Sequence, residues 1–211
     1  MKLIKFIAII LFPPLLFLLV MLFFAFNLGF YQKQYDRIEA MQSISKTNAV
    51  LQAQGVYDYL GGKTDQLAST YTKREQLHLA DIRNIIFYVK LATSVLAILS
   101  LAAFLWLYFK NGIASLLKVL FWSNIVSLII ALILIGSLAL DFSWLFLLFH
   151  QIMFRNDYWQ LDPSTEMLIN LFPPQFFAAL IIKVFLVTII INIAIICSAL
   201  IIKRLKKNPA A

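Results

Sequence analysis

The sequence predicts an all-α integral membrane protein with four transmembrane helices, an extracellular helical cap and a short interfacial or re-entrant segment. Hydrophobic residues make up 62% of the 211 residues and charged residues only 13%, and the mean hydropathy is +0.87. No water-soluble core of this size needs so many apolar side chains. The apolar residues also gather into four long windows, with basic residues concentrated on one side of them, as a membrane topology requires.

The four windows are long enough for membrane-spanning helices, which need about eighteen apolar residues or more. We expect spans at residues 4–26, 85–109, 119–140 and 176–202, within a single membrane domain of residues 1–211. The first window begins with basic residues, as a secretory signal does, but its apolar part is longer and no small-x-small cleavage site follows. We therefore expect the first window to remain as an anchor.

The distribution of charge predicts the orientation. Four spans place both termini on one side, and that side then carries eight basic residues and no acidic one. These are Lys2, Lys5, Lys110, Lys118, Lys203, Arg204, Lys206 and Lys207. This side is expected to be cytoplasmic, with residues 27–84 and 141–175 outside. The net charge of +8 then reflects topology, and nucleic-acid binding has no support.

The first outer segment, residues 27–84, is too long to be a simple turn. The stretch "SKTNAVLQAQGVYDYLGGK" has the apolar spacing of a short amphipathic helix that ends at Gly61 and Gly62. The stretch "TKRE", Thr72 to Glu75, fits a capping box, which predicts a helix start there. Because no glycine or proline follows until Gly112, this helix should run unbroken into the second span.

The second outer segment contains the apolar run 142–154, which is interrupted by His150. Thirteen helical residues cover only about 20 Å of the roughly 30 Å that a bilayer core demands, so the run is expected to lie at the interface or to re-enter. Further on, Asp162 and Pro163 predict the N-cap and first residue of a short helix. That helix should end at the proline pair 173–174.

The two histidines, His78 and His150, are the strongest candidates for chemistry, since both are expected on the outer side near the membrane boundary. Glu75, His78 and Asp81 are spaced i, i+3 and i+6, so they share one helix face and His78 can contact either carboxylate. Glu75 has an alternative role in the capping box. Asp81 could fix the tautomer of His78 or be solvated. A polar ring at His150 is costly in apolar surroundings, which favours a functional role, although it could simply tuck among aromatics.

For several other side chains, the sequence allows more than one role. Arg155 could grip a headgroup, and Lys183 could bind a headgroup, polarise a carbonyl or snorkel to the interface. Trp159 could belong to an aromatic belt at the headgroup level. Zinc is a second choice to acid–base chemistry, because the ligand spacing is loose and the single cysteine, Cys197, lies on the other side. We therefore expect no metal.

Two stretches carry a family resemblance. "TKREQLHLADIRN" and "LLFHQIMFRNDYWQLDPSTEMLINLFPPQFF" resemble the two signature regions of the bacterial lipoprotein intramolecular transacylases, which are small integral membrane proteins with a similar layout of four spans. The resemblance implies catalytic residues His78 and His150. It also implies a supporting set around them: Glu75, Asp81, Asn156, Asp157 and Trp159.

The resemblance further implies an acyltransferase of the bacterial cell membrane whose substrate is a lipoprotein with a diacylglyceryl thioether on its N-terminal cysteine, surrounded by membrane phospholipid. The sn-2 acyl chain would move to the cysteine amine and give the lyso-form lipoprotein, with no cofactor. His78 is expected to be the general base and His150 the oxyanion or proton donor, although the roles could be exchanged. The alternative is a membrane protein that binds lipid or lipoprotein without catalysis, and a transporter is a weaker possibility.

Overall fold

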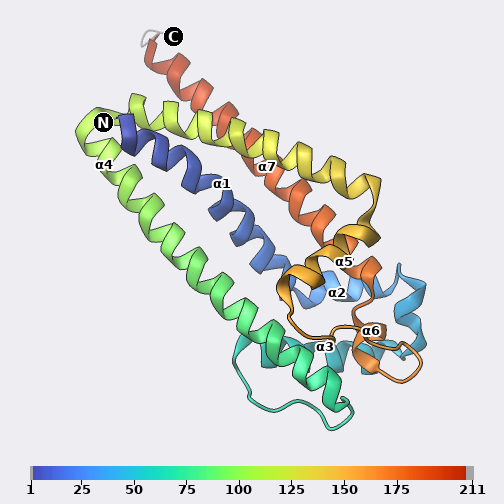
Figure 1. Ribbon diagram of the computed structural model, residues 1–211. Coiled ribbons are helices and arrows are strands. Elements are labelled where there is room, and N and C mark those ends of the chain that lie inside the picture. Colours follow the sequence, from blue (N-terminus) through green and yellow to red (C-terminus); the bar gives the residue numbers. More distant parts are fainter. Residues whose placement is uncertain (1, 208–211) are drawn as a thin grey trace. The chain divides into compact units, whose positions relative to one another are not determined.

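The structure is a computed structural model that describes residues 2–207, and every regular element in this range is helical (Figure 1). The elements are α1 (Lys2–Ala25), α2 (Leu28–Tyr35), the 3-10 helix η1 (Glu39–Ser43), α3 (Lys46–Gly61), α4 (Lys73–Leu140), α5 (Phe142–Met153), α6 (Met167–Leu171) and α7 (Pro174–Lys207). Helices α1, α4 and α7 are long and apolar enough to cross a membrane. The all-α prediction is confirmed.

The chain divides into two compact units, which are described separately. Unit 1 comprises Met1–Met21, Leu91–Ser137 and Lys183–Ala211. Unit 2 comprises Leu22–Lys90 and Leu138–Ile182.

Unit 1 contains most of the apolar windows. Gly112 interrupts α4 with φ 70° and ψ 175°, a backbone conformation that is essentially restricted to glycine. The predicted windows 85–109 and 119–140 lie on opposite sides of this break, and the chain reverses there (Figure 1). Ala8 of α1 is buried in one cluster with Leu107 and Val119, one residue from each half of α4.

Contacts of α1 with α4 and α7 complete unit 1. The rings of Phe12 and Phe104 lie 5.6 Å apart, and those of Phe17 and Phe185 lie 5.3 Å apart. Figure 1 shows the first turns of α1, the break in α4 and the last turns of α7 toward the same end of this unit. Many large apolar side chains on its helices stay exposed, as expected of surfaces that face lipid rather than water.

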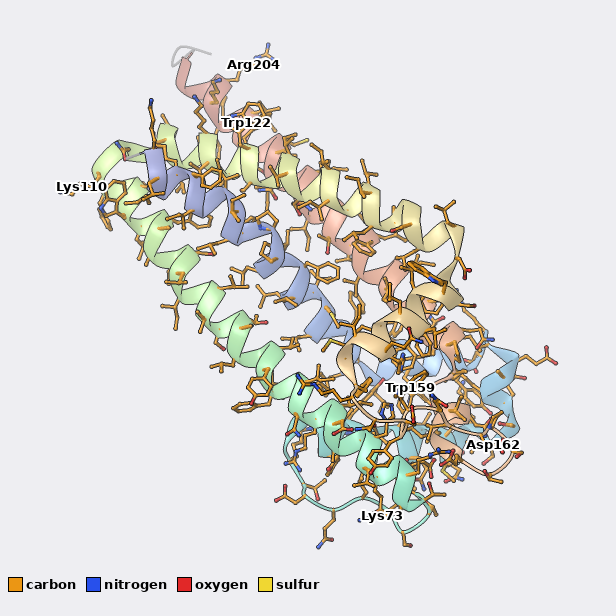
Figure 2. The ribbon with its side chains drawn as sticks, in the orientation of Figure 1. Lys73, Lys110, Trp122, Trp159, Asp162 and Arg204 are labelled. Atoms are coloured by element: carbon orange, nitrogen blue, oxygen red, sulfur yellow. The ribbon has the colours of Figure 1, made fainter. Side chains whose placement is uncertain are left out.

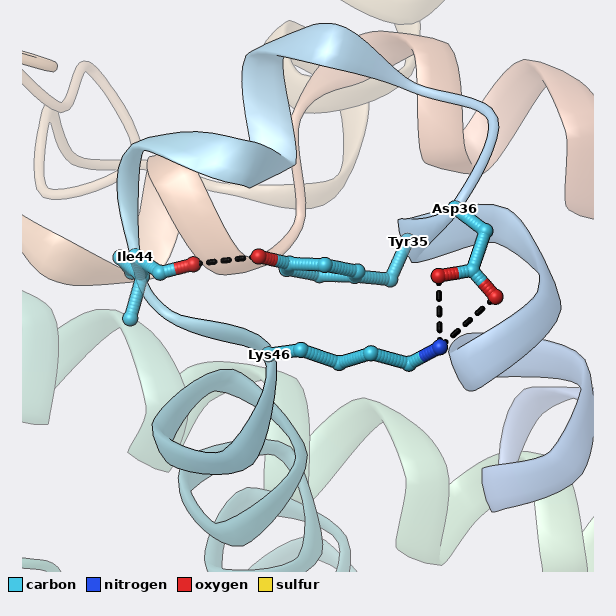
Figure 3. A network of polar contacts seen from close by, with 4 residues as sticks. All are labelled: Tyr35, Asp36, Ile44 and Lys46. Carbon is cyan, nitrogen blue, oxygen red and sulfur yellow. Dashed lines mark hydrogen bonds and ion pairs between the residues drawn. The ribbon is translucent and has the colours of Figure 1, made fainter.

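Unit 2 begins with short helices joined by local polar contacts. Lys46 at the start of α3 pairs with both carboxylate oxygens of Asp36, at 2.6 and 2.8 Å, and the Tyr35 hydroxyl donates to the Ile44 carbonyl at 2.6 Å (Figure 3). Helix α3 ends at Gly62, whose φ of 82° closes the helix in the left-handed conformation. The helix predicted before the glycine pair is confirmed.

The start of α4 also confirms a sequence prediction. Thr72 is the N-cap, its hydroxyl accepts from the Glu75 amide at 3.2 Å, and its own amide donates to the Glu75 carboxylate at 2.6 Å. This is the capping box expected from "TKRE". The helix then runs without interruption to Gly112, as predicted.

The helix expected to open at Pro163 begins later, at Met167, so its predicted start is wrong. The Asp162 carboxylate accepts from the amide and the hydroxyl of Ser164, at 2.8 and 2.7 Å, and this closes a local turn. Glu166 then adopts an extended conformation, with φ −116° and ψ 129°, which prevents helix before Met167. Side-chain bonding in the turn therefore replaces the expected N-cap.

Candidate active site

Glu75, His78 and Asp81 form one face at the start of α4, and this face lies against the loop after α5 and the first turn of α6. The Glu75 carboxylate accepts from the amide of Leu168 at 2.6 Å. The Asp81 carboxylate accepts from the side-chain amide of Asn156 at 2.9 Å. Between these two bonds, the ring of His78 packs edge-on against Phe154, with centroids 4.9 Å apart. The shared face predicted from the sequence spacing is therefore present.

The two histidine rings lie together although 72 positions separate them in the chain. Their centroids are 6.1 Å apart, and the side chains of both residues are buried, with His78 5% and His150 8% exposed. Aromatic rings surround His150: Phe146 at 4.3 Å, Trp159 at 5.0 Å and Phe154 at 5.5 Å. Little water can reach the pair, so any polar reaction between the rings takes place in surroundings of low polarity.

The hydrogen bond of His150 assigns its tautomer. Its Nδ1 lies 2.7 Å from the carbonyl oxygen of Phe146, one helical turn earlier. Because a carbonyl only accepts, Nδ1 carries the proton and Nε2 keeps a lone pair. Burial lowers the pKa of His150 below its usual value, and the bond to the Phe146 carbonyl partly offsets that lowering.

His78 has a different environment. Burial, and then the neighbouring His150, lower the pKa of His78 to about 4, and the negative charge of Asp81 only partly opposes this. The Nδ1 atom of His78 is buried and has no hydrogen-bond partner among residues 2–207. The Asp81 carboxylate bonds the side-chain amide of Asn156 and not a ring nitrogen of His78, so Asp81 acts on His78 through its charge alone, which raises the pKa of His78.

The remaining predicted residues divide into two groups. Trp159 lies against His150, whereas Arg155 and Asp157 are exposed and line an open hollow of about 300 Å³. The Asp157 carboxylate accepts from the side chain of Gln160 at 3.1 Å. Figure 2 labels Trp159 and Asp162 on the loop that connects α5 to α6, and Lys73 at the first residue of α4. Lys183 belongs to α7 in unit 1, whereas the residues described above belong to unit 2.

Sequence reasoning missed Glu166, which is 6% exposed. Its carboxylate accepts from the Thr72 hydroxyl at 3.1 Å and from the Asp162 amide at 2.7 Å. The residue lies inside the longer of the two signature stretches, but it was assigned to the interior of a short helix, where a glutamate carries no special signal. Within residues 2–207, no three histidine, cysteine or acidic side chains gather as a metal-binding group.

Fold and site together define an all-helical membrane protein with a buried pair of imidazoles, a class suited to proton transfer at the membrane. The sequence profile of the lipoprotein intramolecular transacylase family, Lit, matches residues 4–177, and the chain belongs to this family. It is therefore a transacylase, a membrane-integral acyltransferase that acts on lipoproteins.

Solved structures of one bacterial protein share this fold. The membrane-integral lipoprotein intramolecular transacylase Lit from Bacillus cereus superimposes with a TM-score of 0.83 at 21% identity, over 97% of each chain. Two variants of that protein, with one histidine replaced by arginine or by alanine, give TM-scores of 0.78 and 0.77 at 21% identity. They cover 97% of this chain and 94% and 95% of their own. No curated protein sequence matches the chain.

Proposed function

We propose that this transacylase moves the sn-2 acyl chain of a diacylglyceryl lipoprotein to the amine of the N-terminal cysteine, with His78 and His150 managing the protons. The observation that carries the proposal is the buried pair of imidazole rings with centroids 6.1 Å apart. The product is the lyso-form lipoprotein. No step requires a cofactor or a metal, and no acyl-enzyme forms.

The reaction is intramolecular, and this determines what the protein must supply. The amine nitrogen attacks the ester carbonyl through an eight-membered ring of N, Cα, Cβ, S, glyceryl C3, C2, ester O and carbonyl C. The N–C bond forms, the bond between the carbonyl carbon and the glyceryl oxygen breaks, and one proton passes from the amine to that oxygen. Because donor and acceptor are already tethered, orientation supplies much of the acceleration and proton transfer supplies the rest.

The local chemistry supports a definite division of roles. With Nδ1–H held by the Phe146 carbonyl, Nε2 of His150 has the lone pair that takes the amine proton, and the carbonyl stabilises the imidazolium that forms. His78, with its pKa lowered to about 4, is the weaker base and suits donation of a hydrogen bond to the developing oxyanion or to the leaving oxygen. This assignment reverses the roles first expected for His78 and His150.

The surrounding side chains suit the rest of the substrate. The neighbouring set of Glu75, Asp81, Asn156, Asp157 and Trp159 supports the two rings. The exposed guanidinium of Arg155, at the hollow beside Trp159, contacts polar groups of the lipoprotein or a phospholipid headgroup. Lys183 serves as a second headgroup contact on α7. Membrane phospholipid is thus a partner, alongside the lipoprotein.

The two units work as one membrane domain of four spans, since the break at Gly112 divides α4 into two segments that are each long enough to cross. Helix α5 is too short to span, and its exposed Trp144, Phe149 and Ile152 suit the interface. The short helices of unit 2 form the extracellular cap. Both termini are cytoplasmic, so the histidines face outward.

Cysteine labelling tests this orientation. In a Cys197→Ala background, Lys63→Cys should react with an impermeant thiol reagent on intact protoplasts, whereas Arg204→Cys should react only after the membrane is opened. Both native side chains are exposed, so access depends on topology. Labelling of Arg204→Cys alone from outside would invert the proposed orientation.

Mass spectrometry of a lipoprotein tests the activity. Cells that contain the protein should yield an N-terminal cysteine with an amide-linked acyl chain and a lyso-glyceryl group, and cells without it should not. The His78→Ala, His150→Ala double variant, expressed at the same level, is the control for lipoprotein binding. An unchanged N-terminus would instead indicate a protein that binds lipid or lipoprotein without catalysis.

A further inference from the structure

Two buried carboxylates connect the start of α4 to the start of α6 in both directions. Glu75 of α4 accepts from the amide of Leu168, in the first turn of α6, at 2.6 Å. Glu166, the residue before α6, accepts from the hydroxyl of Thr72, the N-cap of α4, at 3.1 Å. Each helix start thus provides a carboxylate to the other. We call these three side chains, Thr72, Glu75 and Glu166, the cross-cap.

We infer that Glu166 is a positioning residue for acyl transfer, which holds the loop 154–166 on α4 and so fixes the His78 and His150 rings at their reacting separation. This inference rests on the transacylase function proposed above. Glu166 touches neither ring. Its effect passes through the loop, whose Phe154 contacts both histidines and whose Trp159 lies against His150.

The loop is attached to α4 at two places, and His78 lies between them. On one side Asn156 donates to Asp81 at 2.9 Å, one turn beyond His78. On the other side Glu166 bonds to Thr72, two turns before it. The same Glu166 carboxylate accepts from the Asp162 amide at 2.7 Å, which fixes the turn that follows Trp159. Loss of Glu166 therefore removes the loop's own bond to α4 at this end, where only the bond from the Leu168 amide to Glu75 remains, while the Asn156 end stays attached.

The two carboxylates of the cross-cap differ in what their partners can do. Both partners of Glu75 are backbone amides, those of Thr72 and Leu168, and an amide N–H can only donate. A glutamine there would point its NH₂ group at a donor and lose one bond. One partner of Glu166 is the Thr72 hydroxyl, which can also accept. A glutamine there keeps both bonds if its carbonyl faces Asp162 and its NH₂ group faces Thr72.

This difference provides a matched test with purified protein and a diacylglyceryl lipopeptide. Glu166→Ala should lower kcat by about tenfold to a hundredfold, the range expected when reacting groups are misplaced by about 1 Å, with KM changed less than about twofold. Glu166→Gln should recover most of kcat, whereas Glu75→Gln should not. Glu39→Gln, at an exposed carboxylate of η1, should match the native protein.

Selective ¹⁵N labelling of histidine gives a second readout, because the chain has only two histidines. Glu166→Ala should shift the ring ¹⁵N signals of His150, while Glu166→Gln should leave them close to native. If Glu166→Ala does not fold, Thr72→Val and Thr72→Ser form a second pair, in which only serine keeps the hydroxyl that bonds Glu166. Valine should then lower kcat and shift the signals, and serine should not.

Separate outcomes overturn the inference and the proposed function. Native kcat in Glu166→Ala, a rise of KM without a fall of kcat, or equal losses in Glu166→Gln and Glu166→Ala would each overturn the positioning role. Unshifted His150 signals in an impaired Glu166→Ala variant would also overturn it. Lack of any acyl transfer by the native protein would instead overturn the proposed function.

Discussion

Buried polar groups are bonded differently in the two units. In unit 1 they bond mostly within one helix: the side-chain amide of Asn124 donates to the Leu120 carbonyl at 2.7 Å, and that of Asn192 to the Thr188 carbonyl at 2.8 Å. Asn192 also donates to the Ser127 hydroxyl at 3.0 Å, which joins α7 to α4. In unit 2, buried and half-buried hydrogen bonds around His78 join residues 75 to 94 positions apart.

The difference shows which part of the chain needs a fixed separation between distant residues. A helix surrounded by lipid needs only to satisfy its own polar groups, and local bonds do this whatever the neighbouring helices do. Two histidines on separate helices can act together only if distant parts of the chain are held at a fixed separation. Long-range bonds of Glu75, Asp81 and Glu166 supply that constraint in unit 2.

The largest stability effect is expected in unit 1, at the break in α4. Gly112→Ala places a side chain at φ 70° and ψ 175°, which should destabilise the folded protein by about 1 to 3 kcal/mol. Thermal unfolding in detergent measures the loss, with Gly136→Ala, in the helical part of α4, as the control. Equal unfolding temperatures for native protein and Gly112→Ala would show that the break tolerates any residue.

Substitutions of two asparagines, one in each unit, compare the units directly. Asn156→Ala removes the bond to Asp81 beside His78 and should lower kcat about tenfold, as expected for a misplaced catalytic group. Asn192→Ala removes the bond to Ser127 in unit 1 and should cost about 0.6 kcal/mol of stability, with kcat near native. The same assay on both variants checks the contrast. A larger kcat loss in Asn192→Ala than in Asn156→Ala would reverse it.

The titration of the two histidines tests the burial of the site. The pKa of His78 is lowered to about 4 and that of His150 lies below its usual 6.5, so both rings should be neutral at pH 7. Because the folded state binds fewer protons than the unfolded state, the stability linked to His78 is complete above pH 6.5 and is lost as pH falls through about 4. Ring ¹⁵N shifts followed against pH measure both midpoints. A midpoint of His78 at 6.5 or higher would contradict the burial.

The smallest effect is expected from chelators. Proton transfer by two imidazoles needs no ion, so EDTA treatment of purified protein should leave kcat within about twofold of native. A loss that zinc specifically restores would make the histidines ligands rather than proton carriers.

Much of the fold could be predicted from the sequence because the signals are local. Long apolar windows predict helices, "TKRE" predicts the start of α4, and the Gly61–Gly62 pair predicts the end of α3. The expected start at Pro163 was wrong because the Asp162 side chain bonds Ser164 instead of capping a helix. An aspartate can cap a helix or close a turn, and the local sequence pattern alone does not distinguish these two roles.

The candidate site could be predicted only in outline. Helical spacing placed Glu75, His78 and Asp81 on one face, but their partners lie far along the chain, in residues such as Asn156 and Leu168. The role of Glu166 depends on the Thr72 hydroxyl, 94 positions away. Likewise, the low pKa of His78 comes from burial and from His150, neither of which is visible before the chain is folded.

The central claim, that His78 and His150 act as one proton-transfer unit, is tested most directly by measuring single-turnover conversion of a diacylglyceryl lipopeptide by three variants. Each of His78→Ala and His150→Ala should lower the rate by about 10² to 10⁴, with the protein still folded. The double variant should be little slower than either single one, since residues that act as a unit are not additive. Near-native conversion by both single variants, or losses that multiply in the double variant, would contradict the claim.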